Sequence, residues 1–158
     1  MSLKQCALFT LMLCFAGFNL VGAGGVGAFA EPVVAPQVSQ PVQFVTAEEL
    51  KAKLAKNGRV TVIDVRATSD LTDSESKIKG AIHVKLRRLQ ARLALLPLKN
   101  IPHDSEVVTY CACPNDEASI RAAQVLMNAG FKHVRVLRGG WVAWKKTNGQ
   151  VEPKPRGL

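Results

Sequence analysis

Two cysteines separated by a single residue, Cys111 and Cys113, are the side chains of this sequence best suited to covalent chemistry. They open a loop between the β-rich run Glu106–Tyr110 and an apolar helical pattern. At such a junction the loop N–H groups and the positive end of the helix dipole face the sulfur, which stabilises a thiolate or an anionic persulfide. A buried, inert cysteine is the alternative, but a polar loop that contains proline argues against burial of the whole segment. We therefore interpret the loop as a site of nucleophilic sulfur chemistry.

Two segments are expected to surround this sulfur. The loop itself supplies Ala112, Cys113, Pro114, Asn115, Asp116 and Glu117. The second segment is Asp64-Val65-Arg66, at the end of another apolar run, because sites in open parallel sheets form outside the carboxyl ends of the strands. Arg66 is expected either to hold an anionic substrate or to form an ion pair with a helix or with Asp64. Asp64 is expected to be structural, accepting hydrogen bonds from loop N–H groups.

Strand and helix patterns alternate along the chain. Capping-box spacing at Thr46 predicts a helix from Ala47 to about Asn57, and the nearly continuous apolar run Val60–Val65 predicts a strand covered on both faces. The further expected elements are a short strand at 80–84, a helix at 86–96, a strand at 106–110, an apolar helix ending at 130, a strand at 134–137 and a short helix at 141–147. This order, without long hairpins, predicts an α/β fold with a small, mainly parallel β-sheet flanked by helices.

Export is indicated by the N-terminus. Residues 1–30 are expected to be a signal peptide, with an apolar core from Cys6 to Val21 and a tail of small residues that ends in Ala28-Phe29-Ala30. Cleavage after Ala30 would leave a periplasmic or secreted protein. An uncleaved membrane anchor is the alternative, because the apolar run is long enough to span a bilayer. Cleavage removes two of the four cysteines and leaves Cys111 and Cys113. So short a spacing makes a strained disulfide that adds little stability, which favours a chemical role.

The rest of the chain divides into a Pro-rich linker at 31–43, one domain at 44–150 and a loose tail at 151–158. Removal of residues 1–30 takes Lys4 and no acidic residue, so the formal charge falls from +9 to +8. This charge favours anions in general. The basic cluster Lys85, Arg87, Arg88 and Arg92 is interpreted as a solvated helix face, and with no aromatic side chains between these residues no nucleic-acid partner is expected.

Several motifs, in order, resemble those of rhodanese domains. Ile63–Arg66 resembles their second-strand motif, and Lys77–His83 (KIKGAIH) resembles their "HIPGAIN" turn. Val107–Cys111 resembles the strand that enters the active-site cysteine. Three further segments resemble the last part of a rhodanese domain: Ala129-Gly130-Phe131, Val134–Leu137 and Gly139–Trp144. The resemblance covers roughly residues 44–147.

This resemblance implies a parallel sheet flanked by helices and a sulfurtransferase mechanism. The loop thiolate takes sulfane sulfur from a small anionic donor, thiosulfate or a polysulfide or persulfide, and holds it as a persulfide. It then passes the sulfur to a thiol or to cyanide, and no metal or organic cofactor is implied. A membrane partner is expected only if the signal is uncleaved.

The loop departs from the rhodanese pattern in two ways. It is longer and has a second cysteine: strand register favours Cys111 as the nucleophile, whereas counting back from Ser119 favours Cys113. It also carries Asp116 and Glu117 where the family pattern has an arginine, and this negative charge disfavours a dianion such as thiosulfate. A catalytically weak sulfur carrier or protein-binding module is therefore the alternative. A cysteine phosphatase is disfavoured because neither cysteine has an arginine six residues later.

Overall fold

The computed structural model describes residues 41–56, 58–67 and 75–153. Within them, the main sheet has five strands in the order β1-β6-β5-β2-β4, and every neighbouring pair is parallel. The strands are β1 (Gln43–Val45), β2 (Val60–Asp64), β4 (Ile82–His83), β5 (Glu106–Tyr110) and β6 (His133–Leu137). This arrangement confirms the predicted parallel α/β fold.

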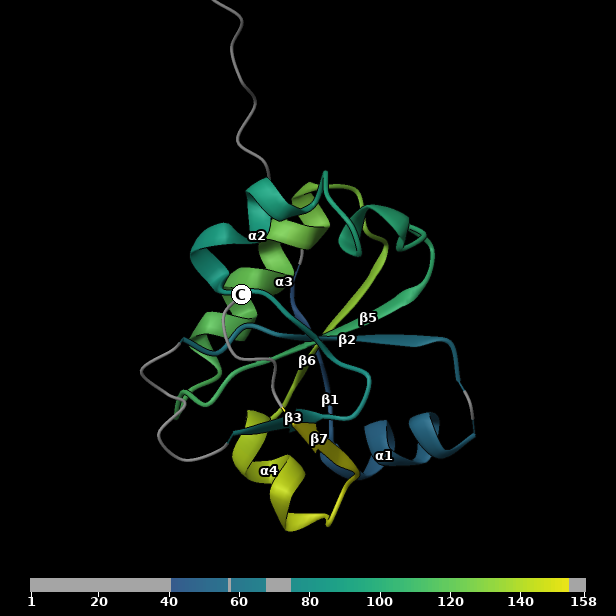
Figure 1. Ribbon diagram of the computed structural model, residues 1–158, viewed down its shortest axis with the longest axis vertical. Helices are drawn as coiled ribbons and strands as arrows, with labels where there is room; N and C mark the ends of the chain where they lie inside the picture. Colours follow the sequence, from purple (N-terminus) through teal and green to yellow (C-terminus); the bar gives the residue numbers. More distant parts are fainter. Residues whose placement is uncertain (1–40, 57, 68–74, 154–158) are drawn as a thin grey trace, which may run out of the picture. The chain divides into compact units, whose positions relative to one another are not determined.

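Helices cover both faces of this sheet (Figure 1). Figure 1 shows α2 (Leu86–Arg92) and α3 (Glu117–Asn128) above the strands, and α1 (Ala47–Ala55) and α4 (Gly140–Lys146) below them. A short 3₁₀ turn, η2 (Leu98–Asn100), follows α2. No helix of the described residues is long and apolar enough to cross a membrane.

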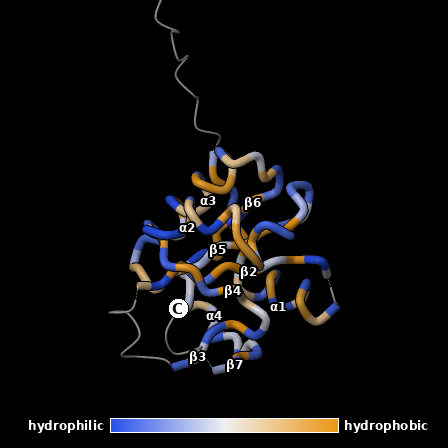
Figure 2. The backbone as a smooth tube through the Cα atoms, turned by 45° about the horizontal axis from the view of Figure 1, so that its top comes forward, coloured by the Kyte–Doolittle hydropathy of each residue, from blue (hydrophilic) through white to orange (hydrophobic). Residues whose placement is uncertain are grey.

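The core consists of two apolar clusters, one on each face of the sheet. Successive β5 residues alternate between them: Val107 packs with the α2 and α3 side chains, whereas Val108 packs with those of α1 and α4. This alternation follows from the period of two along a strand. The hydrophobic stretches of the central strands are visible in Figure 2. Because β5 is buried on both faces, its carboxyl end is fixed within the sheet, and so is the first residue of the loop that follows it.

The predicted start of helix α1 agrees with the structure, whereas the predicted end of helix α2 does not. The capping box of α1 is present: Thr46 Oγ1 accepts from the Glu49 N–H at 3.2 Å, and Glu49 Oε2 accepts from the Thr46 N–H at 2.9 Å. The α2 helix ends at Arg92, earlier than the predicted residue 96. The predicted helix extended to Leu96 because leucines at 86, 89, 93 and 96 have helical spacing, but the Leu96 side chain is 65% exposed.

A second, two-stranded sheet was not predicted. Strand β3 (Ser76–Ile78) pairs antiparallel with β7 (Val151–Pro153), and Lys77 of β3 lies opposite Glu152 of β7 and forms an ion pair with it. The sequence patterns predicted no strand at Ser76–Ile78, and the prediction of a loose tail at 151–158 was wrong at Val151–Pro153. Three-residue strands are too short for periodicity to reveal, and the pairing joins residues 75 positions apart in sequence.

The predicted N-terminal segments fall almost entirely outside the described residues. The signal peptide at 1–30 and most of the linker at 31–43 belong to this part of the chain. The last linker residue, Gln43, is the first residue of β1, which pairs with β6 through Gln43 and Arg135.

Candidate active site

The Cys111 loop begins at the carboxyl end of β5, between two other chain segments. On one side Asp64, the last residue of β2, is in register with Tyr110. On the other side the turn between β6 and α4 approaches closely, and the Trp141 N–H donates to the Cys111 carbonyl oxygen at 2.8 Å. Cys111, the first residue of the loop, is thus held in place by backbone contacts.

Two hydrogen-bond donors converge on the sulfur of Cys111. The Cys113 N–H lies 3.3 Å from Sγ, and the Ser119 hydroxyl, in the first turn of α3, lies 3.5 Å from it. Both donors would stabilise a thiolate or a persulfide. The Cys111 side chain is fully buried, whereas Cys113 is half-buried, and neither forms a disulfide. The geometry therefore favours Cys111 over Cys113 as the reactive sulfur.

Ser119 is a functional candidate that the sequence did not reveal. It served only as a counting point for the helix register, although a serine at the third residue of α3 can turn its hydroxyl toward the preceding loop. The hydroxyl also donates to the Asp116 carbonyl oxygen at 2.8 Å. A hydroxyl has one proton, so it can bond to that carbonyl when Cys111 is a thiol and turn to the sulfur when Cys111 is a thiolate.

The remaining loop residues differ in their environment. Ala112 is half-buried, while Pro114 and Asn115 at the tip are exposed. Asp116 is buried in a left-handed conformation with φ of 55°, and its Oδ2 accepts from the Gly139 N–H at 2.8 Å. Its Oδ1 is buried without a hydrogen-bond partner among the described residues. Glu117 is exposed and pairs with Arg121 at 3.1 Å, so Asp116 is the acidic side chain that bears on the site.

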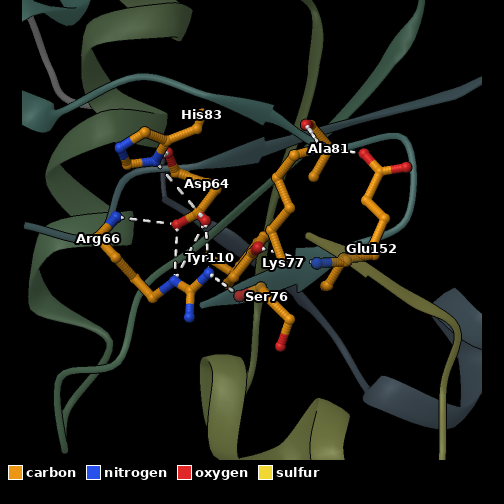
Figure 3. A network of polar contacts seen from close by, with 9 residues as sticks. Asp64, Arg66, Ser76, Lys77, Ala81, His83, Tyr110 and Glu152 are labelled. Atoms are coloured by element: carbon orange, nitrogen blue, oxygen red, sulfur yellow. Dashed lines mark hydrogen bonds and ion pairs between the residues drawn. The ribbon is translucent and has the colours of Figure 1, made fainter. Parts of the chain in front are cut away.

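Arg66 is fully buried, and its guanidinium lies 5.4 Å from the ring centroid of Tyr110, the residue that precedes the cysteine loop. Figure 3 shows this guanidinium beside the Asp64 carboxylate. The guanidinium donates to both carboxylate oxygens of Asp64, from Nε to Oδ1 at 2.9 Å and from Nη2 to Oδ2 at 2.7 Å. It also donates to the Ser76 carbonyl oxygen at 2.8 Å and lies 4.4 Å from the Trp141 ring centroid. Of the two alternatives for Arg66, the structure shows the ion pair with Asp64.

The same network includes His83 and Tyr110. Figure 3 shows His83 and Arg66 directed at the Asp64 carboxylate from two sides. Burial alone would raise the pKa of Asp64, but hydrogen bonds from His83 and Arg66, with the charge of Arg66, outweigh it and hold that pKa well below its usual range. Burial, with the nearby Asp64 charge, raises the pKa of Tyr110. The network is therefore a charged Asp64–Arg66 pair beside a neutral tyrosine, and it braces the ends of β2 and β5.

Gly140 allows the close approach of α4 to the cysteine loop. Its φ is +46°, and a Cβ at this position would lie 2.2 Å from the Cys111 carbonyl oxygen. In the sequence, Gly139-Gly140 stood out only as part of a segment that resembles the last part of a rhodanese domain, and nothing there indicated that this segment contacts Cys111. A residue with a side chain would displace either the loop or the helix.

Comparison with known proteins identifies the family. A family model described as a rhodanese-like domain matches residues 46–147. The chain belongs to the rhodanese-like domain family. A sulfurtransferase of Allochromatium vinosum is 29% identical over 105 residues, which cover 66% of this chain and 90% of that protein. This relative is the same kind of protein that the rhodanese resemblance of the sequence implied.

Solved structures agree with the rhodanese-like fold. The rhodanese-like domain of the Alr3790 protein from Anabaena is 29% identical, covers 75% of this chain and 88% of that one, and has a TM-score of 0.59. The BH2092 protein of Bacillus halodurans is 26% identical and covers 70% of this chain and 77% of that one, also with a TM-score of 0.59. The part of this rhodanese-like chain that the structure describes thus has the architecture of both neighbours.

Proposed function

We propose that this rhodanese-like protein is a sulfurtransferase in which Cys111 carries the sulfur. The observation that supports this most is the convergence of the Cys113 N–H and the Ser119 hydroxyl on the Cys111 sulfur. Hydrogen-bond donors of this kind stabilise the negative charge of a thiolate or persulfide at this position. Its relatives named sulfurtransferase support the same chemistry.

The transfer takes place in two balanced steps. The Cys111 thiolate attacks the sulfane sulfur of a donor, forms a new S–S bond and releases the rest of the donor as a thiolate, or as sulfite if the donor is thiosulfate. An acceptor thiolate then attacks the outer sulfur of the persulfide, leaves with it and restores the Cys111 thiolate. No net oxidation occurs in either step.

Polysulfides and persulfides fit this site better than thiosulfate does. The loop from Ala112 to Glu117 contains no cation, its buried charged side chain is Asp116, and the Arg66 guanidinium is engaged by Asp64. A dianion gains nothing from such surroundings, whereas the outer sulfur of a hydropersulfide carries less charge. We propose a polysulfide or an organic persulfide as donor, a thiol as acceptor, and an exported location for the reaction.

Burial of Cys111 favours a second candidate function. Because its side chain is fully buried, a donor must pass the exposed loop tip, Pro114 and Asn115, to reach the sulfur. If that tip opens rarely, the protein would carry sulfur or bind a partner without turnover. Sustained, cyanide-dependent formation of thiocyanate would exclude this candidate.

The decisive experiment is intact-mass spectrometry of the purified protein after incubation with polysulfide, beside Cys111→Ser and Cys113→Ser. We expect a gain of about one sulfur atom in the parent protein and in Cys113→Ser, removed by cyanide, and no gain in Cys111→Ser. Loss of the added sulfur only in Cys113→Ser would show that the helix register identifies the nucleophile. No added sulfur in the parent protein from any donor would refute the proposed mechanism.

A further inference from the structure

A second concave site lies at the opposite edge of the sheet from β1, beside the edge strand β4. It is an open cavity of about 280 Å³ between β4, helix α2 and the turn η2. Apolar side chains form much of its lining, among them Ile82, Val84, Leu96 and Pro97. No residue of the cysteine loop takes part. A volume at the low end of ligand sites suits one or two inserted side chains better than a large cofactor.

Three cations of α2 and its N-cap line the same cavity: Lys85, Arg88 and Arg92. Their spacing of three and four residues places them on one helix face, spread over about 10 Å of its length. Within the described part of the chain, none of the three forms an ion pair. Lys77 also lines the cavity, but its ammonium pairs with Glu152 and is not counted with them.

These charges are unfavourable for α2 itself. The helix has no acidic residue in its first turn and no side-chain N-cap, so the cations near its N-terminus oppose the helix dipole. Arg88 and Arg92, four residues apart, also repel each other. Beside them Leu96 is 65% exposed. These cations surround an apolar cavity and destabilise the helix that carries them. Such an arrangement is expected of a surface that binds a partner.

We propose that this cavity docks an acidic segment of a partner protein that carries an apolar side chain. The apolar side chain would enter the hollow beside Ile82 and Leu96, and carboxylates on either side of it would meet Lys85, Arg88 and Arg92. A row of separated cations matches several carboxylates along an extended segment and not a single small anion. An anionic bilayer offers the charge but no protruding side chain to fill a hollow.

The cavity lies close to the cysteine loop. His83, in its wall, is in register with Asp64 of β2, which in turn is in register with Tyr110 of β5. Two strand spacings separate His83 from Tyr110, about 10 Å, and Cys111 follows Tyr110. A docked protein would therefore be held beside the sulfur-carrying loop. The idea that it exchanges sulfur there rests on the proposed function, whereas the docking does not.

The test measures binding of a fluorescein-labelled acidic heptapeptide with a central leucine (DEDLEDE) by fluorescence anisotropy. We expect saturable binding to the full chain that weakens at least tenfold when Arg88→Glu and Arg92→Glu are combined, and several-fold when alanine replaces the peptide leucine. Arg87→Glu is the matched control for either substitution alone: it makes the same charge change as Arg88→Glu or Arg92→Glu on the same helix, but outside the cavity lining, and should weaken binding less than twofold. Circular dichroism confirms that each variant is folded.

Three outcomes would overturn the docking proposal. Equal weakening by Arg87→Glu and by the double variant would mean unspecific charge attraction. Insensitivity to the peptide leucine would mean that the hollow is not used. Binding to phosphatidylglycerol vesicles that depends on Arg88 and Arg92, without peptide binding, would identify a membrane surface instead. Cys111→Ser should bind the peptide unchanged, so failure of sulfur transfer and failure of docking are distinguishable.

Discussion

The backbone N–H of Trp141 donates a 2.8 Å hydrogen bond to the carbonyl oxygen of Cys111. This bond joins the start of α4 to the first residue of the cysteine loop. The approach is possible because the neighbouring residue is Gly140, where a Cβ would lie 2.2 Å from the same oxygen. The position of the proposed nucleophile therefore depends on a turn far along the chain.

We expect Gly140→Ala to abolish persulfide formation at Cys111 and to lower the free energy of unfolding by more than about 2 kcal/mol, because it adds both a steric clash and backbone strain. Gly80→Ala is the control, since Gly80 also has a positive φ, +77°, but a Cβ there would meet nothing within 4 Å. Gly80→Ala should lower the free energy of unfolding by about 1–2 kcal/mol, from backbone strain alone, and should leave persulfide formation intact. Denaturant unfolding and intact-mass spectrometry measure the two effects. Equal losses of stability and of persulfide formation in the two variants would mean that the contact between residue 140 and the Cys111 carbonyl has no special effect.

Ser119→Ala should slow persulfide formation about tenfold, because it removes the hydroxyl 3.5 Å from the Cys111 sulfur. The change in stability should be small, about 1 kcal/mol for the lost bond to the Asp116 carbonyl. Ser105→Ala removes an equivalent hydroxyl–carbonyl bond, to Pro102 at 2.7 Å, on the surface away from the loop. Stopped-flow measurement of the reaction with polysulfide should show a normal rate for Ser105→Ala. If both variants react at the parent rate, Ser119 has no part in the chemistry.

The elements that hold the site could be predicted because their signals are local. Strand β5 was expected at Glu106–Tyr110 and is observed there, since its five residues are β-rich and bounded by polar segments. The roles of particular side chains could not be predicted in the same way. Whether Arg66 faces a substrate or Asp64 depends on Trp141, which packs against its guanidinium from an element that begins 74 residues later. Ser119 was overlooked for the same reason: only the folded loop brings its hydroxyl to the sulfur.

Asp64→Asn should destabilise the protein by about 3–5 kcal/mol at pH 7, because it leaves the buried Arg66 charge without its partner. The pKa of Asp64 is lowered in the folded protein, so its contribution to stability is present above its unfolded pKa of about 4 and is lost as the pH falls below that value. The difference between the parent protein and Asp64→Asn should therefore shrink between about pH 4 and pH 2. Guanidinium unfolding at a series of pH values measures this. The exposed Asp104→Asn should change stability at pH 7 by less than about 0.5 kcal/mol.

Asp116→Asn should raise kcat/KM for thiosulfate about tenfold, because it removes a buried negative charge from the loop that receives the dianion. The asparagine carbonyl can still accept the Gly139 N–H, and its amide places a donor where Oδ1 has no partner among the described residues. Persulfide donors, which carry less charge, should gain less. Thiocyanate formation with each donor gives both values.

Glu117→Gln is the matched control for that prediction, since it removes the adjacent negative charge from a side chain that is 71% exposed and paired with Arg121. Solvent screens an exposed charge, so we expect kcat/KM for thiosulfate to change less than twofold. An equal gain in the two variants would mean that the net charge of the loop, and not the buried carboxylate, governs the choice of donor. No gain in Asp116→Asn would mean that the absence of a cation in the loop, and not the presence of Asp116, is what disfavours thiosulfate.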